Sequence, residues 1–238
     1  MRIIVRLILL FAIMKLSVQE VNAQKEGLMA SFGGATYMMD DMKYLQEYFL
    51  SYYPVEGKII SAFPPYFNAS VNYLRHLFPQ LRIGAGYGYS STGAKSDYTD
   101  YSGSLQTDMI VNTHSLGAFV SYIILGNDDL DLLLFGRLDA NFSQLQIVST
   151  ISAPGLSRGT VINCISISPN ASAGIELMYN FKYFSIGMDG GYLVNFPGDL
   201  NITESESKLY DPVDNQRVLN VDWTGWRAGL KVILWLGK

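Results

Sequence analysis

A histidine next to a serine is the residue pair in this sequence with the most obvious chemistry. His114 and Ser115 have the side-chain types of a general base and a nucleophile. The surrounding run alternates apolar with small or polar residues, which is typical of a β-strand, and adjacent side chains of a strand point to opposite faces. His114 therefore cannot accept a proton from Ser115, and the sequence predicts no catalytic residues.

A segment rich in tyrosine, serine and aspartate, residues 90–103, is the main candidate for recognition and is expected to form a loop. Tyrosine supplies rigid contact area, and serine supplies adaptable hydrogen bonds. Glycine and serine also form ordinary turns, so a surface loop without a ligand remains the alternative. The candidate recognition residues are Asp97, Tyr98, Asp100 and Tyr101.

Metal and cofactor sites are not expected. The chain has one cysteine, Cys164, and two histidines, which is too few for the ligand clusters of zinc or iron–sulfur sites. The acidic segment before the last strand lacks the ordered ligand spacing of a calcium loop. His76 follows Arg75 near a predicted turn, where we expect it to anchor an interface.

The composition excludes two broad classes of protein. Of 238 residues, 49% are apolar and 16% are charged, so the chain can bury a substantial core and is not intrinsically disordered. Lysine and arginine number 17 against 21 aspartate and glutamate, a formal net charge of −4. A nucleic-acid partner is not expected, because binding to a phosphate backbone needs clustered positive charge.

The N-terminus has the pattern of a secretory signal peptide, residues 1–23. Arg2 and Arg6 precede a short apolar run, and Ala23 ends a cleavage motif of small residues. The apolar run is far shorter than the ~20 residues that cross a bilayer as a helix. We therefore expect export, cleavage after Ala23 and a single mature barrel domain, residues 24–238.

Eight segments of the mature chain alternate between apolar or aromatic residues and small or polar residues. No later apolar stretch is long enough for a membrane-spanning helix, so this chain could enter a membrane only as a barrel. The predicted fold class is all-β, an eight-stranded antiparallel up-and-down transmembrane β-barrel. The expected strands are residues 27–38, 67–73, 81–90, 115–124, 132–143, 165–179, 184–195 and 225–236.

The connections between these segments alternate between short and long, as they do in outer-membrane barrels. Short turns are expected near residues 76–79, 126–129 and 180–182. These turns and both termini are expected on the periplasmic side. Long extracellular connections are expected at residues 39–65, 92–107, 145–160 and 196–220. Within the first of these, residues 41–50 have the spacing of a short amphipathic helix that caps the barrel mouth.

Alternation alone does not distinguish a membrane barrel from a secreted barrel of the lipocalin type, whose apolar face points inward. Two features favour the membrane. Aromatic residues of the apolar face gather near the short turns, as an interfacial girdle requires. The opposite face is made mainly of glycine, serine and asparagine, which fit inside a narrow tube. The aromatic girdle consists of Tyr73, Tyr122, Tyr179 and Phe184.

The polar face carries charges of both signs into the expected lumen. Four cations face three anions, a near balance that favours internal ion pairs. An unpaired charge in a narrow tube of low dielectric constant is costly, so we expect a hydrogen-bonded plug and a closed lumen, with a gated ion path as the alternative. The expected cluster is Arg82, Arg137, Asp139, Glu176, Asp189, Arg227 and Lys231.

The signal peptide, the glycine-rich opening strand of residues 27–34 and the terminal strand of residues 225–236 resemble those of the small eight-stranded outer-membrane β-barrel family, of the OmpA transmembrane domain, OmpX and OmpW type. The resemblance covers residues 24–238. It implies a barrel that the barrel-assembly machinery inserts into the bacterial outer membrane, in contact with lipid and lipopolysaccharide. The family's last strand usually ends on an aromatic residue, whereas Trp235 is followed here by three more residues.

The sequence thus predicts an integral outer-membrane barrel without catalytic activity or cofactor. Its role is expected to be structural, or one of interaction through the long extracellular loops, including membership of a larger envelope assembly with an unknown protein partner. Two alternatives stay open. One is a narrow conduit or binding site for a small or hydrophobic molecule. The other is a surface lipid-modifying enzyme, which the opposed faces of His114 and Ser115 disfavour.

Overall fold

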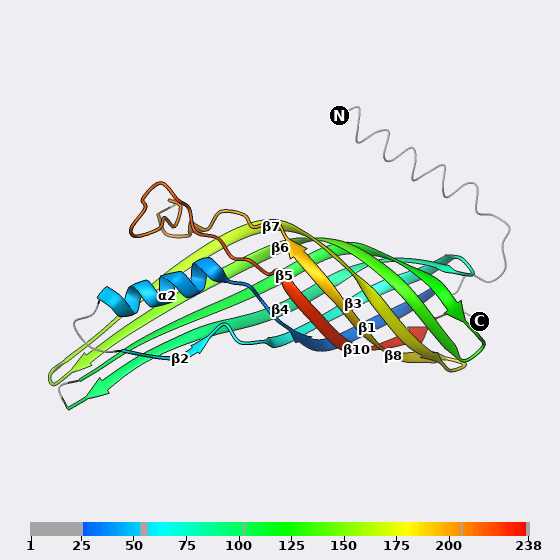
Figure 1. Ribbon diagram of the computed structural model, residues 1–238, viewed down its shortest axis with the longest axis horizontal. Coiled ribbons are helices and arrows are strands. Elements are labelled where there is room, and N and C mark those ends of the chain that lie inside the picture. The colour runs from blue at the N-terminus through cyan, green and yellow to red at the C-terminus, as the bar shows by residue number, and fades with distance from the viewer. Residues whose placement is uncertain (1–25, 53–56, 102, 206, 237–238) are drawn as a thin grey trace.

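The computed structural model of the chain, shown in Figure 1, describes residues 26–52, 57–101, 103–205 and 207–236. The expected signal peptide, residues 1–23, lies outside the described residues. Long strands curve around a common axis, and a helix lies on the concave side of those that extend furthest (Figure 1).

Eight strands form a closed ring in which every neighbour is antiparallel, as the alternation predicts. The ring closes where the first ring strand pairs with the last, in continuous register from Gly27 opposite Trp235 to Ala35 opposite Arg227. Closure pairs the backbone all round, which is the condition for strands to cross a lipid bilayer. In ring order the strands are β1 (Glu26–Ala35), β3 (Tyr66–Phe78), β4 (Leu81–Asp100), β5 (Gly103–Gly126), β6 (Leu130–Ala153), β7 (Leu156–Asn180), β8 (Phe184–Asn195) and β10 (Gly225–Trp235).

Three further elements lie outside the ring. The helix α2 (Asp40–Tyr52) confirms the helix expected at residues 41–50, and its first turn carries Asp40 and Asp41, whose charge interacts favourably with the helix dipole. Strand β2 (Lys58–Ala62) extends the sheet beside β4, and β9 (Asn201–Ile202) pairs with β7. The short turns join β3 to β4, β5 to β6 and β7 to β8, as predicted.

The ring strands differ greatly in length. Strands β4 to β7 have 20 to 25 residues, whereas β1, β3, β8 and β10 have 10 to 13. The long strands project beyond the ring at the end opposite to the short turns (Figure 1). The long loops predicted at residues 92–107 and 145–160 are therefore wrong, because those residues continue the β4–β5 and β6–β7 hairpins.

A reversal of the apolar face along the long strands explains this error. In the ring part of β6, Leu134 and Leu138 point outward and are 50% and 69% exposed. Further along the same strand, Leu145 and Ile147 point inward and are 1% and 2% exposed, while Gln144 points outward. The side chains still alternate between the two faces, but the apolar residues change from the outer to the inner face. A search that follows apolar residues on one face therefore ends the strand at this point.

Outward apolar side chains form a belt around the ring, with contributions from every ring strand. The four predicted girdle residues lie on this outer wall near the short turns, between 37% exposed for Phe184 and 51% for Tyr122. Within the described residues, no helix has the length and apolar character to cross a membrane. Soluble monomers do not expose apolar surface on this scale. The chain is a β-barrel of the bacterial outer membrane, and not a secreted ligand carrier.

Spin labels are expected to report the two faces of the wall. A nitroxide at Leu134 or Leu230, in protein reconstituted into vesicles, should collide freely with oxygen dissolved in the bilayer, because both side chains are at least half exposed on the belt. A label at the adjacent Leu133, which is buried inside the ring, is the matched control and should be shielded. Power-saturation EPR measures the collisions, and equal shielding at positions 133 and 134 would contradict the outward belt.

Candidate functional site

The lumen of the ring is filled in layers, beginning with a polar layer at the end that carries the short turns. Arg82 on β4 donates to Asp131 on β6 at 2.6 Å, and both side chains are at least nine-tenths buried. Asn180 donates to the same carboxylate at 3.0 Å, and Arg82 Nε donates to His76 Nε2 at 3.2 Å. The prediction that His76 anchors an interface is therefore wrong, since its ring faces the interior.

An apolar layer separates this polar layer from the middle of the lumen. On β7, Met178 lies between Asn180 and Glu176, and on β6, Leu133 lies between Asp131 and the charged residues above. The seven predicted lumen charges therefore do not form one cluster, because Arg82 lies on the other side of this layer. The apolar layer consists of Met29, Leu74, Phe119, Leu133, Met178 and Ile233.

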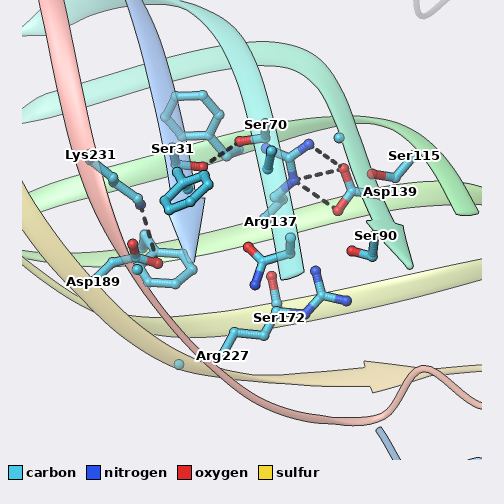
Figure 2. Close-up of a pocket in the computed structure, with 18 of the residues that line it drawn as sticks. Ser31, Ser70, Ser90, Ser115, Arg137, Asp139, Ser172, Asp189, Arg227 and Lys231 are labelled. Carbon is cyan, nitrogen blue, oxygen red and sulfur yellow. Dashed lines mark hydrogen bonds and ion pairs between the residues drawn. The ribbon is translucent and has the colours of Figure 1, made fainter. Parts of the chain in front are cut away.

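Two groups of paired charges fill the middle of the lumen (Figure 2). Arg137 donates through its Nε to both carboxylate oxygens of Asp139, at 2.7 and 2.8 Å. Lys231 contacts Glu176 and lies 3.7 Å from Asp189. Arg137 and Asp139 both lie on β6, whereas the contacts of Lys231 link β10 to β7 and β8. The structure brings these five predicted residues together.

Arg227 lies in the same cavity, and its Nε is buried without a hydrogen-bond partner among the described residues. The sequence analysis misses Asp131, although the parity of β6 places this residue on the same face as Arg137. With Asp131 included, four cations face four anions in the lumen: Arg82, Arg137, Arg227 and Lys231 against Asp131, Asp139, Glu176 and Asp189.

The space left in the lumen is small. A cavity of about 90 Å³ remains among the charged groups and the serine and asparagine side chains above them. That volume leaves room for a few ordered water molecules among the polar side chains. The apolar layer lies below this cavity, and an extracellular core covers it from above.

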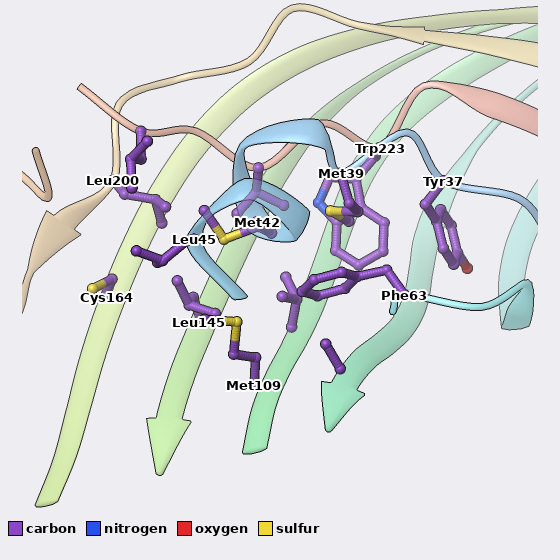
Figure 3. Close-up of a cluster of buried hydrophobic side chains, with 14 of the residues drawn as sticks. Tyr37, Met39, Met42, Leu45, Phe63, Met109, Leu145, Cys164, Leu200 and Trp223 are labelled. Atoms are coloured by element: carbon purple, nitrogen blue, oxygen red, sulfur yellow. The ribbon is translucent and has the colours of Figure 1, made fainter. Parts of the chain in front are cut away.

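The extracellular core belongs to a folded unit that we call the platform. It consists of α2, β2, the projecting parts of β4 to β7, and residues 196–205 and 207–224. Trp223 at its centre is fully buried, and its indole N–H donates to Ser143 Oγ at 2.8 Å. The ring of Trp223 meets Tyr37 edge-on with centroids 4.9 Å apart. Met42 of α2 and Cys164 of β7 pack into the same core (Figure 3).

A charged clasp joins the last long connection to the helix. Arg217 contacts Asp41 in the first turn of α2 and lies 3.7 Å from Asp211. Tyr44 donates to Asp211 at 3.2 Å. The backbone N–H of Val213 donates to Asp211 at 2.8 Å and is the main reason that the pKa of this carboxyl lies below its ordinary value. The carboxylate therefore stays charged in neutral solution and keeps its contacts with α2.

The predicted recognition residues lie at the tip of the β4–β5 hairpin. Asp97 and Tyr98 belong to β4, so the expectation that they lie in a loop is wrong. Asp100 accepts hydrogen bonds from Tyr98 at 2.8 Å and from the backbone N–H of Gly103 at 3.1 Å, which shapes the turn. Tyr101 is 99% exposed and is the member of this set that the fold presents fully to solvent.

The histidine–serine pair is split between the two faces, as the strand pattern predicts. Tyr87 Oη lies 2.5 Å from Nδ1 of His114 on the outer wall, whereas Ser115 lines the lumen cavity. Because the two side chains lie on opposite faces, His114 cannot act as a base for Ser115. In the described part of the chain, no group of three or more histidine, cysteine, aspartate or glutamate side chains is placed to hold a metal ion.

No family model matches this sequence, and no curated protein matches it. Among solved structures, Ail of Yersinia pestis is 13% identical over 90% of this chain and 99% of its own, with a TM-score of 0.39. Neisserial surface protein A is 12% identical over 89% and 97%, with a TM-score of 0.38. The outer membrane protease OmpT of Escherichia coli is 10% identical over 90% and 95%, with a TM-score of 0.40. The likeness is one of fold alone.

Removing one partner of the buried Arg82–Asp131 pair is expected to destabilise the barrel. Asp131→Ala leaves a guanidinium buried without its carboxylate, at a cost of about 3–5 kcal/mol in the free energy of unfolding. The control is the double variant Arg82→Met with Asp131→Leu, which removes both charges and should cost much less. Urea unfolding can be followed by fluorescence, because Arg82 lies over the Trp235 ring at 5.6 Å. Equal losses in the single and double variants would contradict the pairing.

The filled lumen is expected to be closed to solutes. Purified barrel in a planar lipid bilayer should give no steady conductance, because the space inside is a cavity of about 90 Å³ between two apolar layers. A trimeric porin recorded in the same chamber serves as the positive control. Steady openings of porin size from this protein would overturn the closed lumen.

Proposed function

We propose that this protein is a non-catalytic surface protein of the outer membrane, in which the sealed barrel anchors the platform and the platform binds a protein partner. The partner is either another protein of the envelope or a protein outside the cell. The lumen takes no part in transport in this proposal. Contact of the outer wall with lipid and lipopolysaccharide, and insertion by the barrel-assembly machinery, belong to the same proposal.

The observation that carries the proposal is the folded core of the platform. Trp223, Met39 and Met42 are fully buried outside the membrane belt, in a core as dry as that of a soluble domain. Flexible loops lose conformational entropy when they bind, whereas a rigid surface loses little and binds better for the same contacts. The long hairpins, fixed by this core, hold a rigid surface away from the membrane.

The tips of the two hairpins are the favoured contact surface. Tyr101 at the β4–β5 tip is 99% exposed, and Leu156 at the β6–β7 tip is 58% exposed. Aromatic and apolar residues that a fold holds in water commonly become the central contacts of an interface. Arg158, two residues after Leu156 on β7, adds a positive charge that favours an acidic neighbour on the partner.

The non-catalytic part of the proposal is supported by the geometry of the nucleophile candidates. Ser115 faces the lumen while His114 faces outward, and Cys164 is buried in the core of the platform. A nucleophile needs its base within hydrogen-bond reach and a path for the substrate. Neither candidate meets both conditions.

Photo-crosslinking in intact cells tests the proposal. A benzoylphenylalanine at Leu156 is expected to form a discrete protein adduct, and Tyr101→Ala at the neighbouring tip should lower its yield by about tenfold, the loss typical of a central contact residue. Tyr122→Ala is the matched control, because Tyr122 lies on the lipid-facing girdle and should leave the yield unchanged. An adduct that is insensitive to Tyr101→Ala, or no adduct at all, would overturn the proposal.

A further inference from the structure

A hollow in the outer wall of the barrel lies where the belt should be bulky. It has a volume of about 830 Å³ and spans five neighbouring strands, β3, β1, β10, β8 and β7. Its floor is a row of small outward residues in direct register, with Gly34 opposite Ala228 and Ala228 opposite Gly190. A volume of this size lies within the range of small-molecule binding sites, ~300–1,000 Å³.

Large side chains wall the hollow above and below. Trp226 and Tyr192 stand on one side, with ring centroids 5.0 Å apart in an edge-to-face contact. On the other side, two residues along each strand, the next outward row consists of Phe32, Leu230 and Met188, paired in register. The floor is open, because a Cβ added at Gly190 would meet no atom within 4 Å.

We propose that this hollow is a binding site for one acyl chain of a membrane lipid. The hollow lies in the apolar belt, where the surrounding solvent is lipid, and its lining is almost entirely apolar. Apolar surfaces gain no hydrophobic free energy from one another in lipid, so association there depends on close packing. A chain that fills the hollow makes contacts that an unfilled void forfeits.

The length and direction of the hollow also fit an acyl chain. Five adjacent strands at ~4.8 Å spacing span roughly 19 Å, slightly more than the ~15 Å of one leaflet of the hydrocarbon core. The β1–β3 end lies at the rim, where β1 stops at Ala35 and β3 begins at Tyr66. The β7 end, at Ile175, lies within the strand and only a few residues above the short turn. A chain would therefore enter beside Tyr66 and Trp226 and run obliquely toward the middle of the membrane.

A second copy of the barrel is the rival occupant. Two copies that met through this face would place hollow against hollow, because a twofold interface uses the same patch on both partners. The rings of Trp226 and Tyr192 would have to fit the facing hollow, whereas a flexible acyl chain adapts to its shape. The acyl chain is favoured because it is the occupant that reaches the floor at Ala228 and Gly190.

Native mass spectrometry of the barrel, extracted from outer membranes in mild detergent, tests the site. The wild type is expected to retain one lipid per barrel, and Ala228→Leu, which fills the centre of the floor, should lower the retained fraction about tenfold through lost contacts. Ala118→Leu is the matched control, since Ala118 is also an exposed outward alanine, on β5 and outside the hollow, and it should retain lipid like the wild type. Both variants are checked for the folded form by their migration on unheated gels.

Trp226 offers a second measurement, because it is 67% exposed on the wall, whereas Trp223 is buried and the indole of Trp235 donates to the buried Ser185 inside the ring. In phosphatidylethanolamine and phosphatidylglycerol vesicles with brominated acyl chains, its fluorescence should be quenched strongly in the wild type and Ala118→Leu, and less in Ala228→Leu. Equal lipid retention and equal quenching in the two variants would overturn the site. A lipid-free dimer that Ala228→Leu disrupts would show that a second copy fills the hollow instead.

Discussion

The constraint on which the rest of the structure depends is the change of solvent along the long strands. In the ring, lipid surrounds the wall, so Leu134 and Leu138 point outward and polar groups are enclosed. Above the ring, water surrounds the same strands, and Leu145 and Ile147 turn inward to form a core. Because a strand alternates its faces with a period of two, the reversal needs only a change in residue type, and the backbone pairing of β6 with β7 continues without interruption.

The enclosed polar face then has to satisfy its own charges. An eight-stranded ring is too narrow for bulk water, so charged side chains need partners inside the ring. The pairs Arg82–Asp131, Arg137–Asp139 and Lys231–Glu176 meet this need, and the apolar layer around Leu133 separates the first pair from the other two. Ion pairs of this kind add little to stability compared with an apolar filling of the same volume. They do fix the register, because a shift of one residue would turn Asp139 or Lys231 toward lipid.

Period-two alternation is enough to predict the ring strands and the faces of the lumen residues, and helical spacing at residues 41–50 is enough to predict α2. It cannot predict which lumen charges lie at one level, since that depends on the register between strands. The alternation therefore places Arg82 on the same face as Lys231 but does not show the apolar layer that separates them. The same alternation places Asp131 on the inner face, but this residue is adjacent to a predicted turn and is not included in the expected strand. The platform escapes prediction for a different reason, because Leu145 and Ile147 break the outward apolar pattern, and such a break looks like the start of a loop.

Because the strands differ in length, the two sides of the barrel present different surfaces. On the long side, β4 to β7 leave the membrane and need α2 and residues 196–205 and 207–224 to cover their apolar inner face, which produces a rigid surface in water. On the short side, β8, β10, β1 and β3 end near the membrane boundary, so their features can act only within the lipid. Large apolar residues such as Leu230 and Met188 occupy the row next to the hollow. The row Gly34–Ala228–Gly190 leaves open space at the floor of the hollow, since a Cβ added at Gly34 or Gly190 would make no close contact.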